Sequence, residues 1–331
     1  MEKIILDCDP GIDDALAIIL AAKSPKIQVK GITTVAGNSS IENTAKNALK
    51  VLDVLGKEHI PVYKGAKKPL KGQFLNGALV HGKDGLAENN LREPQRSWKD
   101  VNATDFLLES VQKPQGVQTI IATGPLTNIA NGIQKDPLFK ENIKKLIIMG
   151  GAIKNPGNVT RTAEFNIFAD PEAARIVFES GIKNITLVPL DVTQRVIFTS
   201  KMLKKIGNEN FEKKNTFLRF VHQIISFYTN FCISNAGYQG CPLHDPLAVG
   251  EVIDSTFMEK KALNVKVVTK SETFGIKEDE PYDPSKELIR GQTVAELRKG
   301  VNMKTNKPNI NVCLHVEKER FLQYFIETIN S

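Results

Sequence analysis

Short apolar runs alternate along the chain with segments in which apolar residues recur at helical spacing. The apolar runs predict strands over residues 4–8, 29–35, 117–122, 146–149 and 185–189. The helical spacing predicts helices over residues 44–55, 125–133 and 171–180. Strands that alternate with helices are typical of βαβ units and a mostly parallel sheet. We therefore expect a Rossmann-like open α/β sheet with helices on both faces.

The same pattern continues to the end of the chain, with a longer helical segment over residues 211–233 and a late strand over 309–316. No internal repeat and no low-complexity linker interrupts it, so we expect a single domain over residues 1–331. The apolar fraction of 41% fills a sizeable core. The longest apolar stretch, residues 15–22, is too short to cross a bilayer. We expect no membrane partner.

Composition indicates the cellular compartment of the protein and restricts the kinds of partner that we expect. The four cysteines have neither the spacing of a metal site nor the density of a disulfide scaffold, and the N-terminus enters a strand without a secretory signal. These features predict free thiols and a cytoplasmic protein. The formal net charge is +7, but most basic residues are scattered lysines without arginine clusters or interleaved aromatics. We therefore expect a solvated surface and no nucleic-acid partner.

Carboxylates crowd the end of the first predicted strand. Asp7, Asp9, Asp13 and Asp14 fall within eight residues. Asp7 and Asp9 would share one face of a strand, and such crowding is repulsive unless a cation or shared protons relieve it. A hard divalent ion such as calcium or magnesium prefers oxygen ligands. The alternative interpretation, in which Asp9-Pro10 only starts a helix, accounts for Asp9 alone.

Polar residues also follow the other predicted strands. Asn38 comes after the second strand, Thr123 and Gly124 after the third, and Gly150 and Gly151 after the fourth. Ligands of open α/β sheets bind beyond the carboxyl ends of the strands. These positions therefore predict one shared site with the carboxylate cluster.

Three further segments carry candidate chemistry. Glu164 and Asn166 would share one face by strand-like alternation, and as a pair they suit a polyhydroxylated ligand. Asp170-Pro171 resembles an ordinary helix cap. His244 and Asp245 place an imidazole beside a carboxylate, and His81 lies in a glycine-bracketed stretch, residues 77–85, that could serve as a mobile lid.

Together these motifs resemble the inosine-uridine preferring nucleoside hydrolase family. The resemblance rests on residues 7–14, 123–128, 149–151, 164–166 and 244–246, whose sequences are DCDPGIDD, TGPLTN, MGG, EFN and HDP. The matches keep a consistent order between residue 4 and about residue 320. As an ordered set they are highly specific.

The resemblance implies an enzyme that hydrolyses ribonucleosides to ribose and free base at a tightly bound calcium ion. It implies that Asp9, Asp14, Asp245 and the Thr123 carbonyl hold the ion, and that Asp9 takes a proton from the attacking water. His244 matches the acid for the leaving base, and His81 a residue that closes over that base. The remaining substrate-binding residues that it implies are Asp13, Asn38, Asn158, Glu164 and Asn166 around the ribose hydroxyls, with Met149, Phe165 and Tyr228 completing the set.

The base pocket departs from family patterns. Cys232 replaces an aromatic or polar residue, and Ala236 falls where pyrimidine-preferring members tend to have tyrosine. We expect broad or purine-tolerant specificity. The family also implies nucleoside catabolism and salvage as the setting, with a homodimer or homotetramer as the assembly.

Two other classes fit parts of the sequence. A haloacid dehalogenase-like phosphatase would use Asp7 as nucleophile and Asp9 as acid and base. However, Pro10-Gly11 does not supply the hydroxyl-bearing or β-branched residue that such enzymes usually carry two positions after the second aspartate. A non-catalytic nucleoside or pentose binding protein would need neither a water-activating carboxylate nor a proton donor. Retention of Asp9, Asp14, Asp245 and His244 favours the enzyme.

Overall fold

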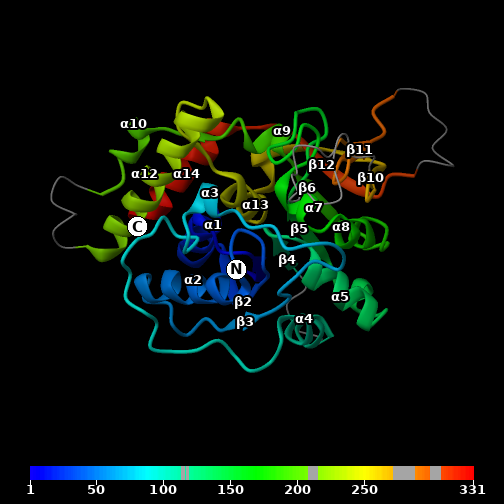
Figure 1. The fold of residues 1–331 in the computed structure, drawn as a ribbon, viewed down its shortest axis with the longest axis horizontal. Coiled ribbons are helices and arrows are strands. Elements are labelled where there is room, and N and C mark those ends of the chain that lie inside the picture. Colours follow the sequence, from blue (N-terminus) through cyan, green and yellow to red (C-terminus); the bar gives the residue numbers. More distant parts are fainter. Residues whose placement is uncertain (113–115, 117–118, 208–214, 271–287, 299–306) are drawn as a thin grey trace, which may run out of the picture.

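A computed structural model describes residues 1–112, 116, 119–207, 215–270, 288–298 and 307–331. Its centre is an eight-stranded sheet in the order β3-β2-β1-β4-β5-β6-β12-β9 (Figure 1). All neighbouring strands pair in parallel except β9, which runs antiparallel to β12 at one edge. The strands are β1 (Glu2–Cys8), β2 (Ile27–Thr34), β3 (Val62–Lys64), β4 (Thr119–Ala122), β5 (Lys145–Met149), β6 (Ile185–Val188), β9 (Met258–Leu263) and β12 (Ile310–Val316).

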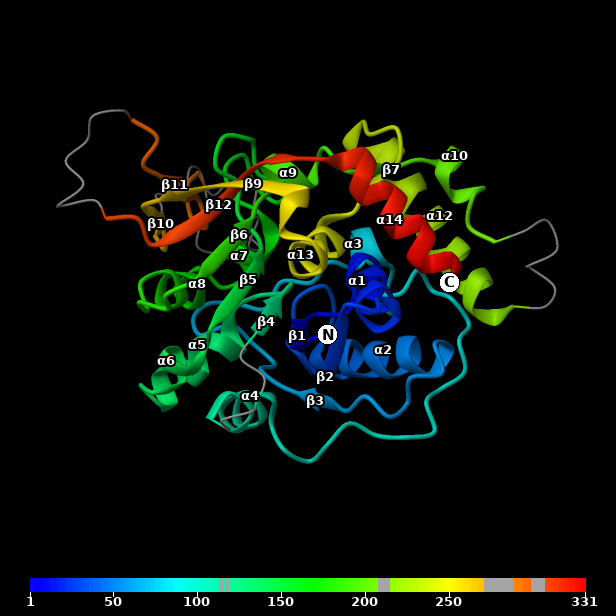
Figure 2. The same ribbon diagram turned by 180° about the vertical axis from the view of Figure 1, so that it is seen from behind.

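Helices cover both faces of this sheet, as Figures 1 and 2 show from opposite sides. One apolar core lies under α1 (Ile12–Lys23), α2 (Ile41–Val54), α12 (Thr216–Ala236), α13 (His244–Ile253) and α14 (Lys318–Asn330). The other lies under α4 (Ala103–Gln112), α5 (Thr127–Lys135), α6 (Phe139–Asn142) and α8 (Pro171–Phe178). Strand β1 serves both, because Ile4 and Leu6 enter the first core and Ile5 the second.

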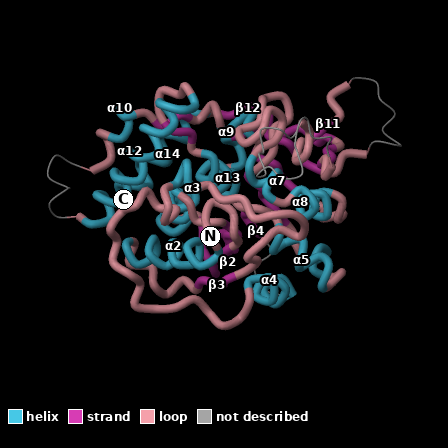
Figure 3. Tube along the Cα trace, viewed as in Figure 1, coloured by secondary structure: helices cyan, strands magenta, loops and turns pink. Residues whose placement is uncertain are grey.

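Four further short helices complete the chain between the larger elements (Figure 3). They are α3 (Ala78–His81), α7 (Phe165–Ala169), α9 (Leu190–Thr193) and α10 (Ser200–Leu203). Two small antiparallel pairs join β7 (Ile197–Phe198) to β8 (Cys241–Pro242) and β10 (Val265–Val267) to β11 (Thr293–Ala295). A 3-10 turn, Ser255–Phe257, precedes β9. Among the residues placed by the structure, no helix is long and apolar enough to cross a membrane.

The observed architecture confirms the predicted open, mostly parallel α/β sheet. The predicted strands and helices occur within about three residues of their expected bounds where the structure describes them. Residues 117–118 of the third predicted strand and 211–214 of the long helix lie outside the described residues. The alternative interpretation of Asp9-Pro10 as a helix start is wrong, because α1 begins at Ile12 with Gly11 as its N-cap residue.

The strand order places a topological switch at β1. The chain runs outward from β1 to β2 and β3, then crosses to β4 on the other side of β1. The loops after β1 and β4 therefore diverge and leave a crevice at the carboxyl ends, where ligands of doubly wound sheets bind. Asp9 follows β1 and Thr123 follows β4, so both residues flank this switch point.

Candidate active site

Asp9 lies in a closely fitted slot after β1. Its side chain is fully buried, and its Oδ2 accepts a hydrogen bond of 2.6 Å from the Asn38 backbone N–H. A Cβ atom at Gly37 would lie 2.1 Å from Asp9 Oδ2, and one at Gly124 would lie 2.6 Å from Oδ1. Both glycines are therefore needed for the chain to approach this carboxylate. Within the described residues, Asp9 Oδ1 has no hydrogen-bond partner.

Asp14 is held by donors from three separate elements. Its Oδ2 accepts from the Gly11 backbone N–H at 3.0 Å and from Asn38 Nδ2 at 2.9 Å. Its Oδ1 accepts from Thr123 Oγ1 at 2.8 Å. Burial raises the pKa of Asp14, while these donors lower it in part. The turn after β1, the loop after β2 and the end of β4 are thereby joined at one carboxylate.

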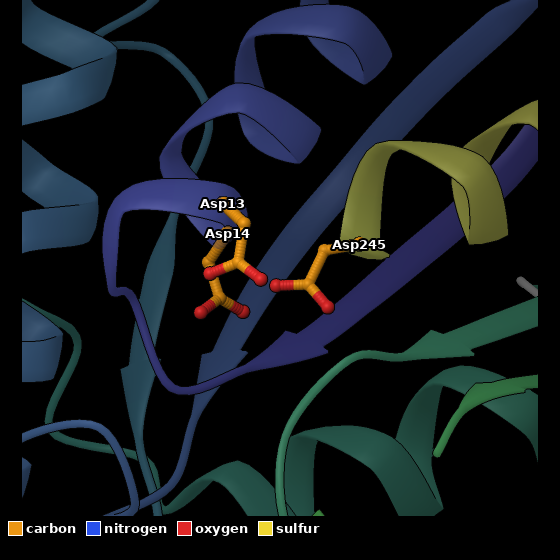
Figure 4. Close-up of side chains that lie close together, drawn as sticks. All are labelled: Asp13, Asp14 and Asp245. Atoms are coloured by element: carbon orange, nitrogen blue, oxygen red, sulfur yellow. The ribbon is translucent and has the colours of Figure 1, made fainter. Parts of the chain in front are cut away.

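Asp13, Asp14 and Asp245 offer oxygens that lie within 4.8 Å of one another. Figure 4 shows the first two projecting from the start of α1 toward Asp245 at the start of α13. Burial and Asp14 raise the pKa of Asp13 to about 7. Burial and the neighbouring carboxylates also raise the pKa of Asp245 well above its usual value. Asp9 is outside this trio, although burial, Asp14 and Asp13 raise its pKa as well.

The donor set fits a hard divalent cation. Four carboxylates, Asp9, Asp13, Asp14 and Asp245, are each at most 7% exposed. One oxygen of Asp9 and one of Asp13 lack a hydrogen-bond partner in the described part of the chain. Buried anionic oxygens are costly unless a proton or a cation relieves them, and calcium and magnesium both bind such oxygens. The structure thus brings together three of the four carboxylates that crowd the start of the sequence, Asp9, Asp13 and Asp14, and adds Asp245.

Asn166 and Glu164 border the same cluster, but for a different reason from the one predicted. Glu164 is the N-cap of α7 and accepts from the backbone N–H of Asn166 at 2.9 Å and of Gly151 at 2.9 Å. The expected strand-like alternation is therefore wrong. Asn166, in the first turn of α7, donates from Nδ2 to the Thr123 carbonyl at 2.7 Å and to the Met149 carbonyl at 3.2 Å.

Ring-bearing side chains form another part of the site. His81, on α3, accepts a 3.1 Å hydrogen bond at Nδ1 from the Ile12 backbone N–H. Its ring centroid lies 6.1 Å from that of Tyr228 on α12. Burial lowers the pKa of His81 to about 3, so this ring is neutral near pH 7.

Asn158 accepts at Oδ1 from the Phe165 backbone N–H at 2.9 Å, which links the loop before α7 to that helix.

His244 opens α13 directly beside Asp245. Its Nδ1 lies 2.7 Å from the Thr193 hydroxyl, and both side chains are buried. Burial lowers the pKa of His244 to about 4. The imidazole is thereby fixed in direction at the edge of the carboxylate cluster.

Asp7 does not belong to the cluster. Its Oδ1 accepts from Thr33 Oγ1 at 2.6 Å and from Asn128 Nδ2 at 2.9 Å, and burial raises its pKa to about 6. A carboxylate enclosed in this way is not available as the nucleophile that a phosphatase needs.

Asp170 caps α8 as predicted, accepting from the Ala173 backbone N–H at 3.1 Å.

Two residues of α9 were not among the candidate site residues that the sequence indicated. Asp191 accepts from the backbone N–H groups of Ile153 and Lys154, each at 2.8 Å, and so positions the loop after Gly151. Thr193 contacts His244. Their signal was available, because they follow β6 at the same carboxyl edge as the other site residues.

The chain matches the family model described as inosine-uridine preferring nucleoside hydrolase over residues 4–323. It is 38% identical over 276 residues to uridine nucleosidase 1 of Arabidopsis thaliana, covering 83% of this chain and 80% of that protein. It is 34% identical over 330 residues to the pyrimidine-specific ribonucleoside hydrolase RihA of Salmonella arizonae, covering 98% and 97%.

Solved structures agree with this match. The purine-preferring ribonucleoside hydrolase from Gardnerella vaginalis aligns with a TM-score of 0.85 at 33% identity, covering 99% of this chain and 98% of that one. The plant nucleoside hydrolase PpNRh1 aligns with a TM-score of 0.87 at 31% identity, covering 100% and 99%.

Proposed function

This chain belongs to the inosine-uridine preferring nucleoside hydrolase family, and from that membership we propose that it hydrolyses ribonucleosides to ribose and free base with calcium at its carboxylate cluster. The membership confirms the expected enzyme class, N-ribosyl hydrolysis. One observation supports the proposal above all others. Four buried carboxylates converge at the switch point of the sheet, and two of their oxygens lack a partner within the described residues.

We assign the cation to the carboxylates of Asp9, Asp14 and Asp245 and to the Thr123 carbonyl. That carbonyl already accepts from Asn166, and its second lone pair is available to a ligand. Bound calcium would lower the pKa of a coordinated water and orient it. Asp9 would accept the proton of the water that attacks the sugar. Burial and Asp14 raise the pKa of Asp9 in the metal-free protein, and a bound cation would lower it again.

The sugar side of the site holds the ribose, and we define it as Asp9, Asp13, Asp14, Asn38, Thr123, Met149, Asn158, Glu164, Asn166 and Asp245. Positive charge develops on the sugar as the glycosidic bond breaks, and nearby carboxylates stabilise it electrostatically. Asp13 is the proposed partner of the 2′-hydroxyl. Because water attacks directly, the reaction needs no covalent glycosyl intermediate, and we expect inversion at the anomeric carbon.

The base side of the site holds the nucleobase, and we define it as His81, Phe165, Tyr228 and His244. The departing base takes the bonding electron pair and needs a proton. His244 supplies it from a ring nitrogen, which keeps the electrons of the broken N–H bond. Burial lowers the pKa of His244 to about 4, so its protonated form is a stronger acid than free imidazolium but a minor species at pH 7.

The decisive experiment incubates the purified protein with inosine and with uridine and measures release of ribose. Both substrates belong in the assay because the relatives include uridine nucleosidases, a pyrimidine-specific hydrolase and a purine-preferring one. We expect turnover of both, with one calcium ion per chain in elemental analysis. No ribose release from either would contradict the proposal. Light scattering of the purified protein tests the proposed homodimer or homotetramer.

A further inference from the structure

Thr193 is the only residue whose hydrogen bond to the His244 ring is seen among the described residues. The hydroxyl Oγ1 lies 2.7 Å from His244 Nδ1, and the threonine is fully buried. Because Nδ1 is engaged, Nε2 is the ring nitrogen left to meet a ligand. No motif of the family resemblance includes Thr193, and only its position after β6, at the carboxyl edge of the sheet, points to the site.

The backbone around this pair is fixed independently of the hydrogen bond. Thr193 ends α9, where its backbone N–H donates to the Pro189 carbonyl at 3.2 Å. The following segment forms β7, which pairs with β8 immediately before His244. The Leu243 backbone N–H donates to the Val196 carbonyl at 3.0 Å. The register of this small sheet therefore sets where the threonine hydroxyl lies relative to the imidazole.

We propose that Thr193 is a positioning residue for the leaving-group step, holding His244 so that Nε2 carries a proton toward the nucleobase. This inference rests on the acid role proposed above for His244. Among the described residues, no hydrogen bond joins Thr193 to the carboxylates or to a group assigned to the sugar, so we expect its effect to be confined to the base side.

A hydroxyl can partner Nδ1 in both protonation states of the ring. It donates or accepts by rotating its O–H bond. When the ring is neutral, the hydroxyl donates to Nδ1, and the single ring proton stays on Nε2. When the ring is protonated, the hydroxyl accepts from Nδ1–H, and Nε2–H again faces the ligand. A carbonyl or carboxylate can only accept, so it would place the proton of the neutral ring on Nδ1 and leave Nε2 bare.

The test compares Thr193→Val, which removes the hydroxyl at nearly constant shape, with Thr193→Ser, which keeps it. The substrates are inosine and 4-nitrophenyl riboside, whose leaving group departs without a proton. We expect Thr193→Val to lower kcat for inosine by about tenfold to a hundredfold, below the two to four powers of ten that acid catalysis supplies in full. KM and nitrophenyl riboside turnover should change by less than about threefold, and serine should restore inosine turnover.

Three controls separate the possible outcomes. Thr328→Val makes the same change at a buried threonine of α14 and should leave both activities intact. His244→Ala tests the acid role itself, and equal losses on both substrates would overturn that role together with this inference. If His244→Ala is selective for inosine while Thr193→Val is not, only the inference fails. In the double variant, the loss should not exceed that of His244→Ala.

A measurement without turnover completes the test. The ¹⁵N chemical shifts of the histidine ring report its tautomer, and the His244→Ala spectrum assigns the signal among the five histidines. We expect an Nε2–H tautomer for His244 in the original protein and in Thr193→Ser. In Thr193→Val the signal should shift toward a mixture. An Nδ1–H tautomer in the original protein would overturn the inference even if Thr193→Val fails to fold.

Discussion

The sugar side and the base side of the site are built in different ways. On the sugar side, Asp9 follows β1, whereas Asp13, Asp14 and Asp245 lie in the first turns of α1 and α13. Asp14 accepts from three donors and Asp9 from one. The base side draws its rings from α3, α7, α12 and α13, and each imidazole has one hydrogen bond to its ring among the described residues.

This difference indicates where the chain fixes chemistry and where it leaves room for variation. A carboxylate that several elements hold together cannot move without disturbing all of them. Each imidazole of the base side is held by a single ring hydrogen bond among the described residues, so its neighbours can change while the fold persists. Relatives named for uridine, pyrimidine and purine nucleosides fit that division.

The strongest test of the contrast removes Asp9. Asp9→Ala should reduce turnover of inosine and of 4-nitrophenyl riboside alike, by several powers of ten, because it removes a proposed metal ligand and the base for the water. Steady-state kinetics on both substrates measure the loss. The exposed Asp100→Ala serves as a control of equal chemistry. Near-normal activity of Asp9→Ala would contradict the assignment.

A second test removes a hydroxyl from the substrate instead. We expect 2′-deoxyinosine to be poorer than inosine by at least about a hundredfold in kcat/KM, because Asp13 and the cation lose a partner that they cannot replace. Sites built to bind a substrate hydroxyl reject an analogue without it by about four to five powers of ten. The glycosidic bond of the deoxy sugar is easier to cleave, which offsets part of this penalty. In Asp13→Ala the preference should shrink. Similar kcat/KM values for the two substrates in the original protein would contradict the proposal that Asp13 binds the 2′-hydroxyl.

Metal removal tests the charge balance of the sugar side. Folding raises the pKa of Asp13 from 3.8 to about 7, so the folded protein binds this proton more tightly than the unfolded chain. Without metal, stability should therefore fall as pH rises from about 4 through 7. Calcium at one fixed concentration, set to a hundred times its Kd at pH 7, should add about 2.7 kcal/mol at that pH, and the gain should be larger at pH 8 than at pH 5. Calorimetry with calcium or with a chelator measures this difference, and a gain that grows toward low pH would refute the site.

The smallest effect is expected on the base side. Tyr228→Phe keeps the ring beside His81 and removes only the hydroxyl. One hydrogen bond contributes about 0.5–1.5 kcal/mol, so kcat/KM for inosine should fall by no more than about tenfold. Uridine measured in parallel shows whether the hydroxyl discriminates between bases. A loss as large as that of Asp9→Ala would erase the distinction between the two sides.

Much of the fold could be predicted because its strands are buried on both faces and therefore appear as continuous apolar runs. Edge strands lack that signal. The interior of β9 is exposed, and its sequence, MEKKAL, does not resemble a buried strand. β3 has only three residues, too few for periodicity to appear. Both strands are specified by pairing with a neighbour rather than by their own sequences.

The candidate site divides in the same way. The strand ends allowed the convergence of Asp9, Asn38 and Thr123 to be predicted from local sequence and a general rule of sheet topology. The hydrogen bond between Thr193 and His244 joins residues that are 51 positions apart in the sequence. A two-stranded sheet, with two residues in each strand, brings their segments together. Such a contact is determined by tertiary packing, which a single sequence does not display.

The slot formed by Gly37 and Gly124 has a further consequence for Asp9. With the two glycine backbones against its carboxylate, the side chain is confined to one rotamer before any substrate arrives. The conformational entropy of orienting the base is therefore lost once, when the protein folds, and not again in each catalytic cycle. The same confinement leaves no space for one more methylene, so a glutamate at this position could not present its carboxylate in the same place.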